Sequence, residues 1–266
     1  MRKLHVFPAV KHVLLSTINH FGFAFHISWP WMLALLPLNV AVNLYMVSVT
    51  LTGAPAYDPY LISLSLMLLV ASTVAFSSIA VSWHRYILVD EIPHGWKRLR
   101  VDGIVWRYVG NTLLIILIMF GIGFVGGFLL AIIAGILTAT LSQNFGLLVV
   151  VPIAAAGVAF GITSTFRLMT KLPAVALGRR DYTLGYAWRD TAGNFWPILG
   201  YALLIFIVLA VIGGLVSALA IPLSELGFAG ISVSLLFQLA VNWFGTIVGV
   251  TMLTSLYGIF YEGRAV

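Results

Sequence analysis

Long stretches without a formal charge are the feature that most constrains this sequence. Residues 108–166 contain no Asp, Glu, Lys or Arg, and one helix needs only about 20 apolar residues to cross a hydrocarbon core of about 30 Å. Across all 266 residues, 61% are hydrophobic and 8% are charged. A soluble domain is about 45–50% apolar and about 25% charged. We therefore predict an all-α polytopic integral membrane protein.

The uncharged stretches divide into six predicted transmembrane helices. A Gly- and Pro-containing turn separates the first two, and the cluster Thr138, Thr140, Ser142, Gln143 and Asn144 marks a reversal within residues 108–166. We expect a single membrane domain, 1–266, with cytoplasmic segments at 83–111 and 167–196. Its predicted spans are 30–52, 60–82, 112–137, 145–166, 197–221 and 232–261.

The N-terminal region predicts a helix that lies in the membrane interface. Arg2 and Lys3 resemble the start of a signal peptide, but Lys11, His12 and polar residues at 19–20 interrupt the apolar run that follows, and no cleavage site is present. We interpret residues 7–25 as an amphipathic interfacial helix, with a frayed cytoplasmic tail as the alternative.

The basic residues indicate the orientation of the chain. All fourteen Lys and Arg residues lie before the first predicted span, in 83–111, in 167–196 or after the last span, and the three opposite loops have none. Short basic segments remain in the cytoplasm during insertion. Both termini are therefore predicted to be cytoplasmic.

Two similar strings suggest an internal repeat. Residues 105–111 (VWRYVGN) recur as 187–194 (AWRDTAGN), and each copy precedes a predicted span. We predict three parallel units, each a cytoplasmic interfacial helix followed by a two-span hairpin. The alternative is convergence, because Trp and Arg are common at every membrane interface.

The sequence offers little for catalysis. It has no cysteine, no HExxH metal motif, no G-x-S-x-G elbow and no Gly-rich phosphate loop outside the apolar spans. All six histidines are expected at the interface or in the cytoplasm. The cluster His84, Arg85, Asp90, Glu91 and His94 resembles an acid/base site, but solvated ion pairs are the favoured interpretation. We predict a protein that is not an enzyme, with no catalytic residue, no metal and no cofactor.

Amide side chains form two polar stripes within the apolar spans. Asn39 and Asn43 are four residues apart in the first span, as are Gln238 and Asn242 in the last, so each pair shares one helix face. Hydrogen bonding between packed helices is one interpretation. A polar cavity for a lipid headgroup or small solute is the other.

Basic residues beside aromatic ones suggest contact with anionic lipid. Lys97, Arg98 and Arg100 accompany Trp96, while Arg179 and Arg180 precede Tyr182. Juxtamembrane cations are attracted to anionic leaflets by about 1 kcal/mol each. The same charges also determine topology, so selective headgroup recognition is a separate hypothesis. The basic residues do not form a readable face, and no nucleic-acid partner is expected.

Two motifs carry a resemblance to a known group. The strings F-R-L-x-x-x-L-P-A-x-A-L-G (166–178) and A-W-R-x-T-x-G-N-F-W (187–196) resemble bacterial inner-membrane proteins similar to the membrane domain sometimes fused to glycerophosphodiester phosphodiesterases. The resemblance implies an all-helical bacterial inner-membrane module linked to lipid metabolism. The chain has no room for the soluble phosphodiesterase domain, so no catalytic residues transfer.

The expected function follows from these features. We predict a non-catalytic bacterial inner-membrane scaffold or accessory protein that binds membrane lipid, chiefly anionic, or another membrane protein. The alternative is an uncoupled or sodium-coupled transporter, or a lipid translocator, that uses the amide stripes.

Overall fold

The computed structural model describes residues 2–52, 58–140, 143–224 and 226–264, and all regular structure in these ranges is helical. Six helices are long: α2 (Phe21–Thr52), α3 (Pro59–Val89), α4 (Gly103–Thr140), α5 (Gln143–Met169), α8 (Phe195–Ser224) and α9 (Gly227–Tyr257). The shorter elements are α1 (Val6–Asn19), the 3₁₀ turn η1 (Gly95–Arg98), α6 (Lys171–Ala176), α7 (Leu184–Asp190) and the π turn η2 (Gly258–Glu262).

The prediction of six membrane-spanning helices is confirmed. Within the described ranges, six helices are long and apolar enough to cross a membrane. Most extend past the predicted limits, because a helix continues its backbone hydrogen bonds beyond the lipid. Thr138 and Thr140, for example, were expected in a turn but lie in α4, where each hydroxyl donates to a carbonyl one turn earlier, at 2.8 Å. Ser142 lies outside the described residues.

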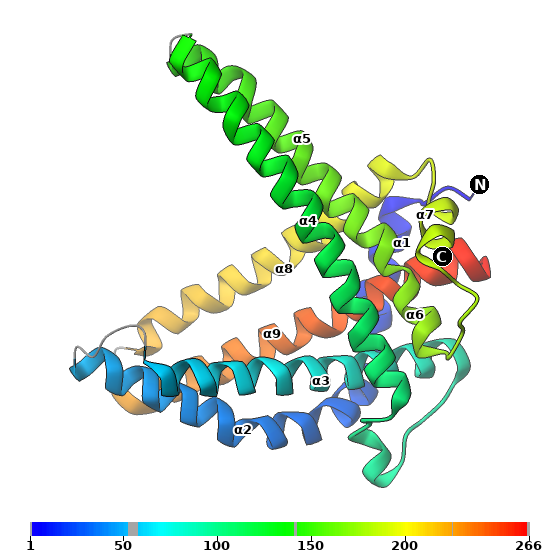
Figure 1. Ribbon diagram of the computed structural model, residues 1–266. Helices are drawn as coiled ribbons and strands as arrows, with labels where there is room; N and C mark the ends of the chain where they lie inside the picture. Colours follow the sequence, from blue (N-terminus) through cyan, green and yellow to red (C-terminus); the bar gives the residue numbers. More distant parts are fainter. Residues whose placement is uncertain (1, 53–57, 141–142, 225, 265–266) are drawn as a thin grey trace.

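Consecutive long helices pack side by side in three pairs, α2 with α3, α4 with α5 and α8 with α9. Figure 1 shows that the α4–α5 pair projects away from the other long helices. Helix α9 also contacts α1, α3 and α6, and the pairs meet near the two chain termini (Figure 1). We call this region, residues 2–19, 84–107, 167–196 and 258–264, the basic end, since it contains every Lys and Arg of the sequence.

The hydrophobic core lies next to the basic end. The buried residues of α3 fall between Ala75 and Leu88, and those of α4 between Val105 and Ile115. In α8 the buried apolar residues fall between Ile198 and Ile205. Side chains farther along these helices, toward the opposite tips, are largely exposed, and in a bilayer they would face lipid.

Helix α1 is packed into this core. Its residues Ala9, Val13 and Thr17 recur every four positions and are buried, chiefly against α8 and α9. The predicted interfacial helix at 7–25 ends earlier, at His20, whose φ of −105° and ψ of 20° leave the helical region. Pro30, the predicted start of the first span, lies inside α2. Membrane helices tolerate such a proline because neighbouring groups satisfy the freed backbone carbonyl.

The two motifs singled out in the sequence contact one another. Arg167, at the end of α5, donates from Nε to the Thr191 hydroxyl at 2.9 Å and from a terminal nitrogen to the Trp188 carbonyl at 2.6 Å. Its guanidinium also lies 3.6 Å from the centre of the Trp188 ring. This buried arginine joins α5 to α7 through charge-assisted hydrogen bonds and a cation–π contact.

Asn194 holds the N-terminal segment, which precedes α1, against the same region through hydrogen bonds. Its side-chain oxygen accepts the Leu4 N–H at 2.9 Å, and its Nδ2 donates to the Arg2 carbonyl at 2.9 Å. The corresponding residue of the other string, Asn111, lies inside α4 and donates to the Arg107 carbonyl at 2.8 Å. The two strings therefore have different backbones, because Gly193, with φ of +73°, interrupts the second one.

Candidate functional site

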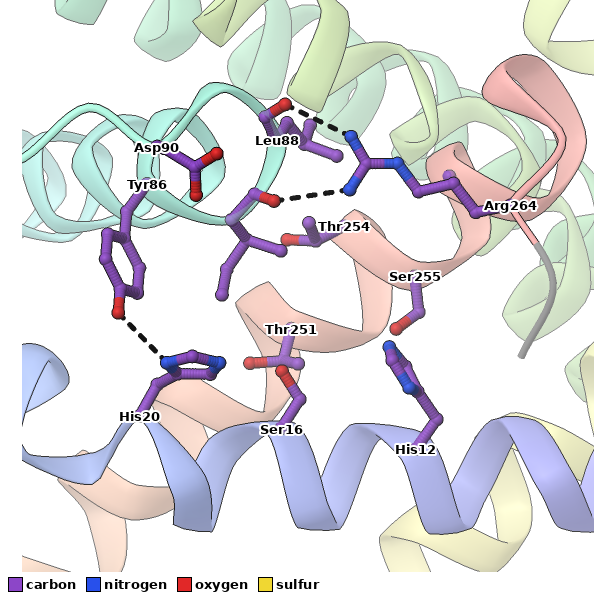
Figure 2. Close-up of a pocket in the computed structure, with 12 residues that line it drawn as sticks. His12, Ser16, His20, Tyr86, Leu88, Asp90, Thr251, Thr254, Ser255 and Arg264 are labelled. Carbon is purple, nitrogen blue, oxygen red and sulfur yellow. Dashed lines mark hydrogen bonds between the residues drawn. The ribbon is translucent and has the colours of Figure 1, made fainter.

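A polar cavity of about 230 Å³ lies where α1 crosses the ends of α3 and α9. Figure 2 shows its lining, to which seven of the twelve residues contribute a hydroxyl or an imidazole, one contributes a carboxylate and one a guanidinium. The residues are His12, Ser16, His20, Tyr86, Ile87, Leu88, Asp90, Thr251, Thr254, Ser255, Gly258 and Arg264.

Helix α1 presents a polar stripe to this cavity. His12, Ser16 and His20 recur every four residues, so they lie on one face beside the buried apolar stripe of the same helix. Nδ1 of His20 lies 3.0 Å from the Tyr86 hydroxyl, within hydrogen-bond distance. Burial lowers the pKa of His12 from its ordinary value of 6.5, which favours the neutral imidazole.

Arg264 closes the cavity on the side of α3. Its two terminal nitrogens donate to the carbonyls of Ile87 and Leu88, at 3.3 and 3.1 Å, and its Nε donates to Glu262 at 2.7 Å. A cation at this position complements the partial negative charge at the C-terminus of α3. The cavity is thus suited to an uncharged polar group that can both donate and accept hydrogen bonds.

Beneath the cavity, His84 is fully buried between three helices. Its Nδ1 lies 2.8 Å from the Thr254 hydroxyl and its Nε2 lies 3.2 Å from the Tyr108 hydroxyl. Since Thr254 donates its proton to the Val250 carbonyl, its oxygen is left to accept the N–H of Nδ1, and Nε2 then accepts from Tyr108. The sequence did not indicate that His84 would be enclosed by protein, where it joins α3, α4 and α9, and its interfacial or cytoplasmic position stays a prediction.

The remaining members of the predicted acid/base cluster separate. The Glu91 carboxylate accepts a hydrogen bond from Nε of Arg85 at 2.6 Å and one from Arg100 at 2.8 Å. Asp90 instead borders the polar cavity. Arg100 also lies 3.1 Å from Asp102. His94 is exposed. The ion-pair interpretation therefore holds for Arg85 and Glu91. Arg100, which was predicted to contact anionic lipid, is already paired with two carboxylates.

The other predicted lipid contacts fall at two separate places. Arg98 borders a cavity of about 220 Å³ with Trp29 and Trp96, while Lys97 is exposed beside them. Arg179 and Arg180 border a second cavity, of about 190 Å³, between α4 and α6. Its other lining residues are Arg107, Asn111, Lys171 and Val175, and we call it the basic cavity. That Arg107 and Lys171 would join Arg179 was not predictable from the sequence, because 64 residues separate the first two.

The amide stripes do not come together in this structure. Asn39 donates to the Leu35 carbonyl at 3.0 Å and Asn43 to the Asn39 carbonyl at 2.8 Å, both within α2. Gln238 and Asn242 are exposed on α9. The amides of α2 thus bond their own helix rather than a partner helix. Within the described residues, no group of three or more His, Asp or Glu side chains is placed to hold a metal ion.

We expect His84→Leu to destabilise the protein, because the Tyr108 and Thr254 hydroxyls would each lose a buried partner at a cost of about 1–3 kcal/mol. The midpoint of thermal unfolding in mild detergent should fall. His94→Leu changes an exposed histidine of the same region and should leave the midpoint unchanged. Equal midpoints for the two variants would contradict this account of His84.

Glu91 predicts a pH dependence of stability. The hydrogen bond from Arg85, followed by that from Arg100, lowers the pKa of Glu91 below its ordinary value of 4.5. Its stabilising contribution is therefore complete above pH 4.5 and is lost as the pH falls through the lower folded-state pKa. Glu91→Gln should lower the thermal midpoint near neutral pH, and the difference from the wild type should shrink in acid. A difference that stays constant with pH would show that Glu91 contributes through packing alone.

No family model matches the chain, and no curated protein or solved structure matches it either. The resemblance to the membrane domain of glycerophosphodiester phosphodiesterases thus rests only on the motifs within 166–178 and 187–196.

Proposed function

We propose that this chain is a non-catalytic scaffold or accessory protein of the bacterial inner membrane, which binds anionic lipid through its basic end. Another membrane protein is the second class of partner that we propose. The observation that supports lipid binding is the concentration of all fourteen Lys and Arg residues at the end where the helices are packed together.

Most of these cations are available to a lipid surface. Lys97, Arg179, Arg180 and Arg189 are exposed, and Trp96 beside Lys97 is 89% exposed. Amphipathic Trp side chains favour the headgroup region, where adjacent cations meet anionic lipid. Ion pairs with acidic residues occupy Arg85 and Arg100, so we assign these two a structural role.

The translocator alternative has less support from the geometry. A transport pathway needs polar groups that face a shared cavity, whereas Asn39 and Asn43 bond the backbone of α2 and Gln238 is exposed on α9. The three cavities described above border residues of the basic end and not the amide stripes.

We further propose that the basic end faces the cytoplasm, with three helix pairs derived from a parallel repeat and with interfacial segments preceding the spans. The positive-inside rule supports the orientation. The pairing of consecutive long helices supports the repeat, although the strings 105–111 and 187–194 now differ in backbone.

Single-cysteine labelling in intact cells tests the orientation, and the chain has no native cysteine. Tyr60, in the first turn of α3, and Leu226, between α8 and α9, are exposed and lie at helix ends remote along the chain from the basic end. Tyr60→Cys and Leu226→Cys should therefore react with a membrane-impermeant reagent. Lys97→Cys should react only after the cells are permeabilised. The reverse pattern would overturn the proposed orientation.

Lipid preference tests the proposed function. In bilayers that contain anionic and zwitterionic lipid, we expect purified wild-type protein to enrich anionic lipid at low salt. Changing Lys97, Arg98, Arg179 and Arg180 together to Gln should reduce this enrichment, because their attraction to the leaflet is lost. Gln238→Leu with Asn242→Leu, a change on α9 that removes polar groups but no charge, should leave it intact. Wild-type protein with no anionic preference at low salt would contradict the proposal.

A further inference from the structure

We propose that the basic cavity is a binding site for a phosphomonoester, presented either by a lipid headgroup or by free phosphate. This inference rests on the proposed function and makes it more specific. It assigns lipid binding to one cavity and one headgroup chemistry, whereas the proposed function concerns the charged surface of the basic end as a whole.

Four cations from separate parts of the chain converge on this cavity. Arg107 comes from the first turns of α4, Lys171 begins α6, and Arg179 and Arg180 follow α6. Asn111, one turn after Arg107, adds an amide. Among the residues that the structure describes, no carboxylate belongs to the lining. Like charges so gathered repel one another, and an anion in the cavity would relieve that repulsion.

The surrounding contacts leave most of this charge uncompensated. Glu262 lies 4.0 Å from Arg179, but it also pairs with Arg264 at 2.7 Å. The Arg179 guanidinium lies 5.1 Å from the centre of the Tyr261 ring, which holds it without neutralising it. In the described part of the chain, Lys171 and Arg180 have no anionic partner within 4.0 Å.

The backbone at the end of α6 directs the two arginines. Gly178 has φ of +78°, its N–H donates to the Val175 carbonyl at 2.9 Å, and the Arg179 N–H donates to the Ala174 carbonyl at 3.0 Å. This pair of bonds is the Schellman arrangement, in which a glycine in the left-handed region turns the chain back over the helix end. Arg179 and Arg180 are thereby held near Lys171, which opens the same helix.

The charge of the site favours a phosphomonoester over a phosphodiester. A monoester carries about −1.5 to −2 charge near pH 7 and offers three acceptor oxygens, whereas a diester carries one negative charge. Arginine and lysine donors suit such oxygens. Beyond Asn111, α4 exposes Leu113, Leu114 and Leu117, which gives an acyl chain an apolar surface next to the cavity. A lipid such as phosphatidic acid thus fits the headgroup site and the adjoining helix.

The test compares two phospholipids in the full-length protein. Protein is reconstituted in phosphatidylcholine bilayers containing phosphatidic acid or phosphatidylglycerol at matched surface charge, extracted in mild detergent and washed at roughly 1 M salt, where the Debye length is about 3 Å. Co-purifying lipid is then quantified by mass spectrometry. We expect the wild type to retain phosphatidic acid roughly tenfold better than phosphatidylglycerol, as two charge-assisted hydrogen bonds would allow.

Matched variants locate the site. Lys171→Gln with Arg180→Gln should abolish the preference, whereas Lys3→Gln with Lys11→Gln removes the same charge from exposed positions outside the cavity and should preserve it. Lys171→Arg with Arg180→Lys keeps the charge and should retain binding, which separates lost binding from lost folding. Equal retention by the two Gln variants, or equal retention of the two lipids by a wild type that also binds no inorganic phosphate, would overturn the site.

Two further measurements distinguish a lipid headgroup from free phosphate as the ligand, and failure of this site from failure of the proposed function. Binding of radiolabelled inorganic phosphate to protein in phosphatidylcholine bilayers, without retention of phosphatidic acid, would assign the cavity to free phosphate. Retention of phosphatidic acid that inorganic phosphate does not displace would assign it to lipid. An anionic preference that is present at low salt and lost equally for both lipids at high salt, with no binding of inorganic phosphate, would leave the proposed function standing and remove the site. No preference at low salt would contradict the proposed function itself.

Discussion

Helices surrounded by lipid gain no hydrophobic energy by packing on one another, and this constraint determines where the protein is held together. Association in that setting depends on close contacts and on hydrogen bonds between helices. Such contacts gather at the basic end, where His84 joins α3, α4 and α9 and Arg167 joins α5 to α7. Toward the opposite tips, the hydrogen bonds from Tyr45 to Asp58 and from Ser234 to the Ala220 carbonyl join helices of one pair, and Figure 1 shows the α4–α5 pair projecting away from the others.

The same concentration of polar groups gives the basic end two cavities of different chemistry. The end of α3 leaves backbone carbonyls without a helical partner, and beside the polar cavity Arg264 donates to two of them, those of Ile87 and Leu88. The basic cavity forms where the start of α4 meets α6, and among the described residues only one of its cations, Arg179, lies within 4.0 Å of a carboxylate, that of Glu262. The first site is suited to an uncharged polar group and the second to an anion, although both lie at one end of the molecule.

The spans were predictable from the sequence because a charge-free stretch long enough to cross lipid has few other uses. Burial near the span ends was not predictable. His84 stands next to Arg85 in the chain, yet the first is enclosed by α4 and α9 and the second pairs with Glu91. Likewise, the charge of Arg100 does not indicate whether a carboxylate or a lipid will satisfy it, since Glu91 and Asp102 reach it only after folding. For Asn39, backbone carbonyls of its own helix supply a partner that the stripe pattern did not anticipate.

The two motifs that carry the resemblance contact one another, which gives their residues a structural role. Arg167 of the first stacks on Trp188 and bonds Thr191 of the second, while Asn194 holds the backbone of Arg2 and Leu4. These residues dock the end of α5, helix α7 and the N-terminal segment on one another. A chain that shares the motifs therefore shares a way of fastening its helices, and function must be argued instead from the cavities that this fastening creates.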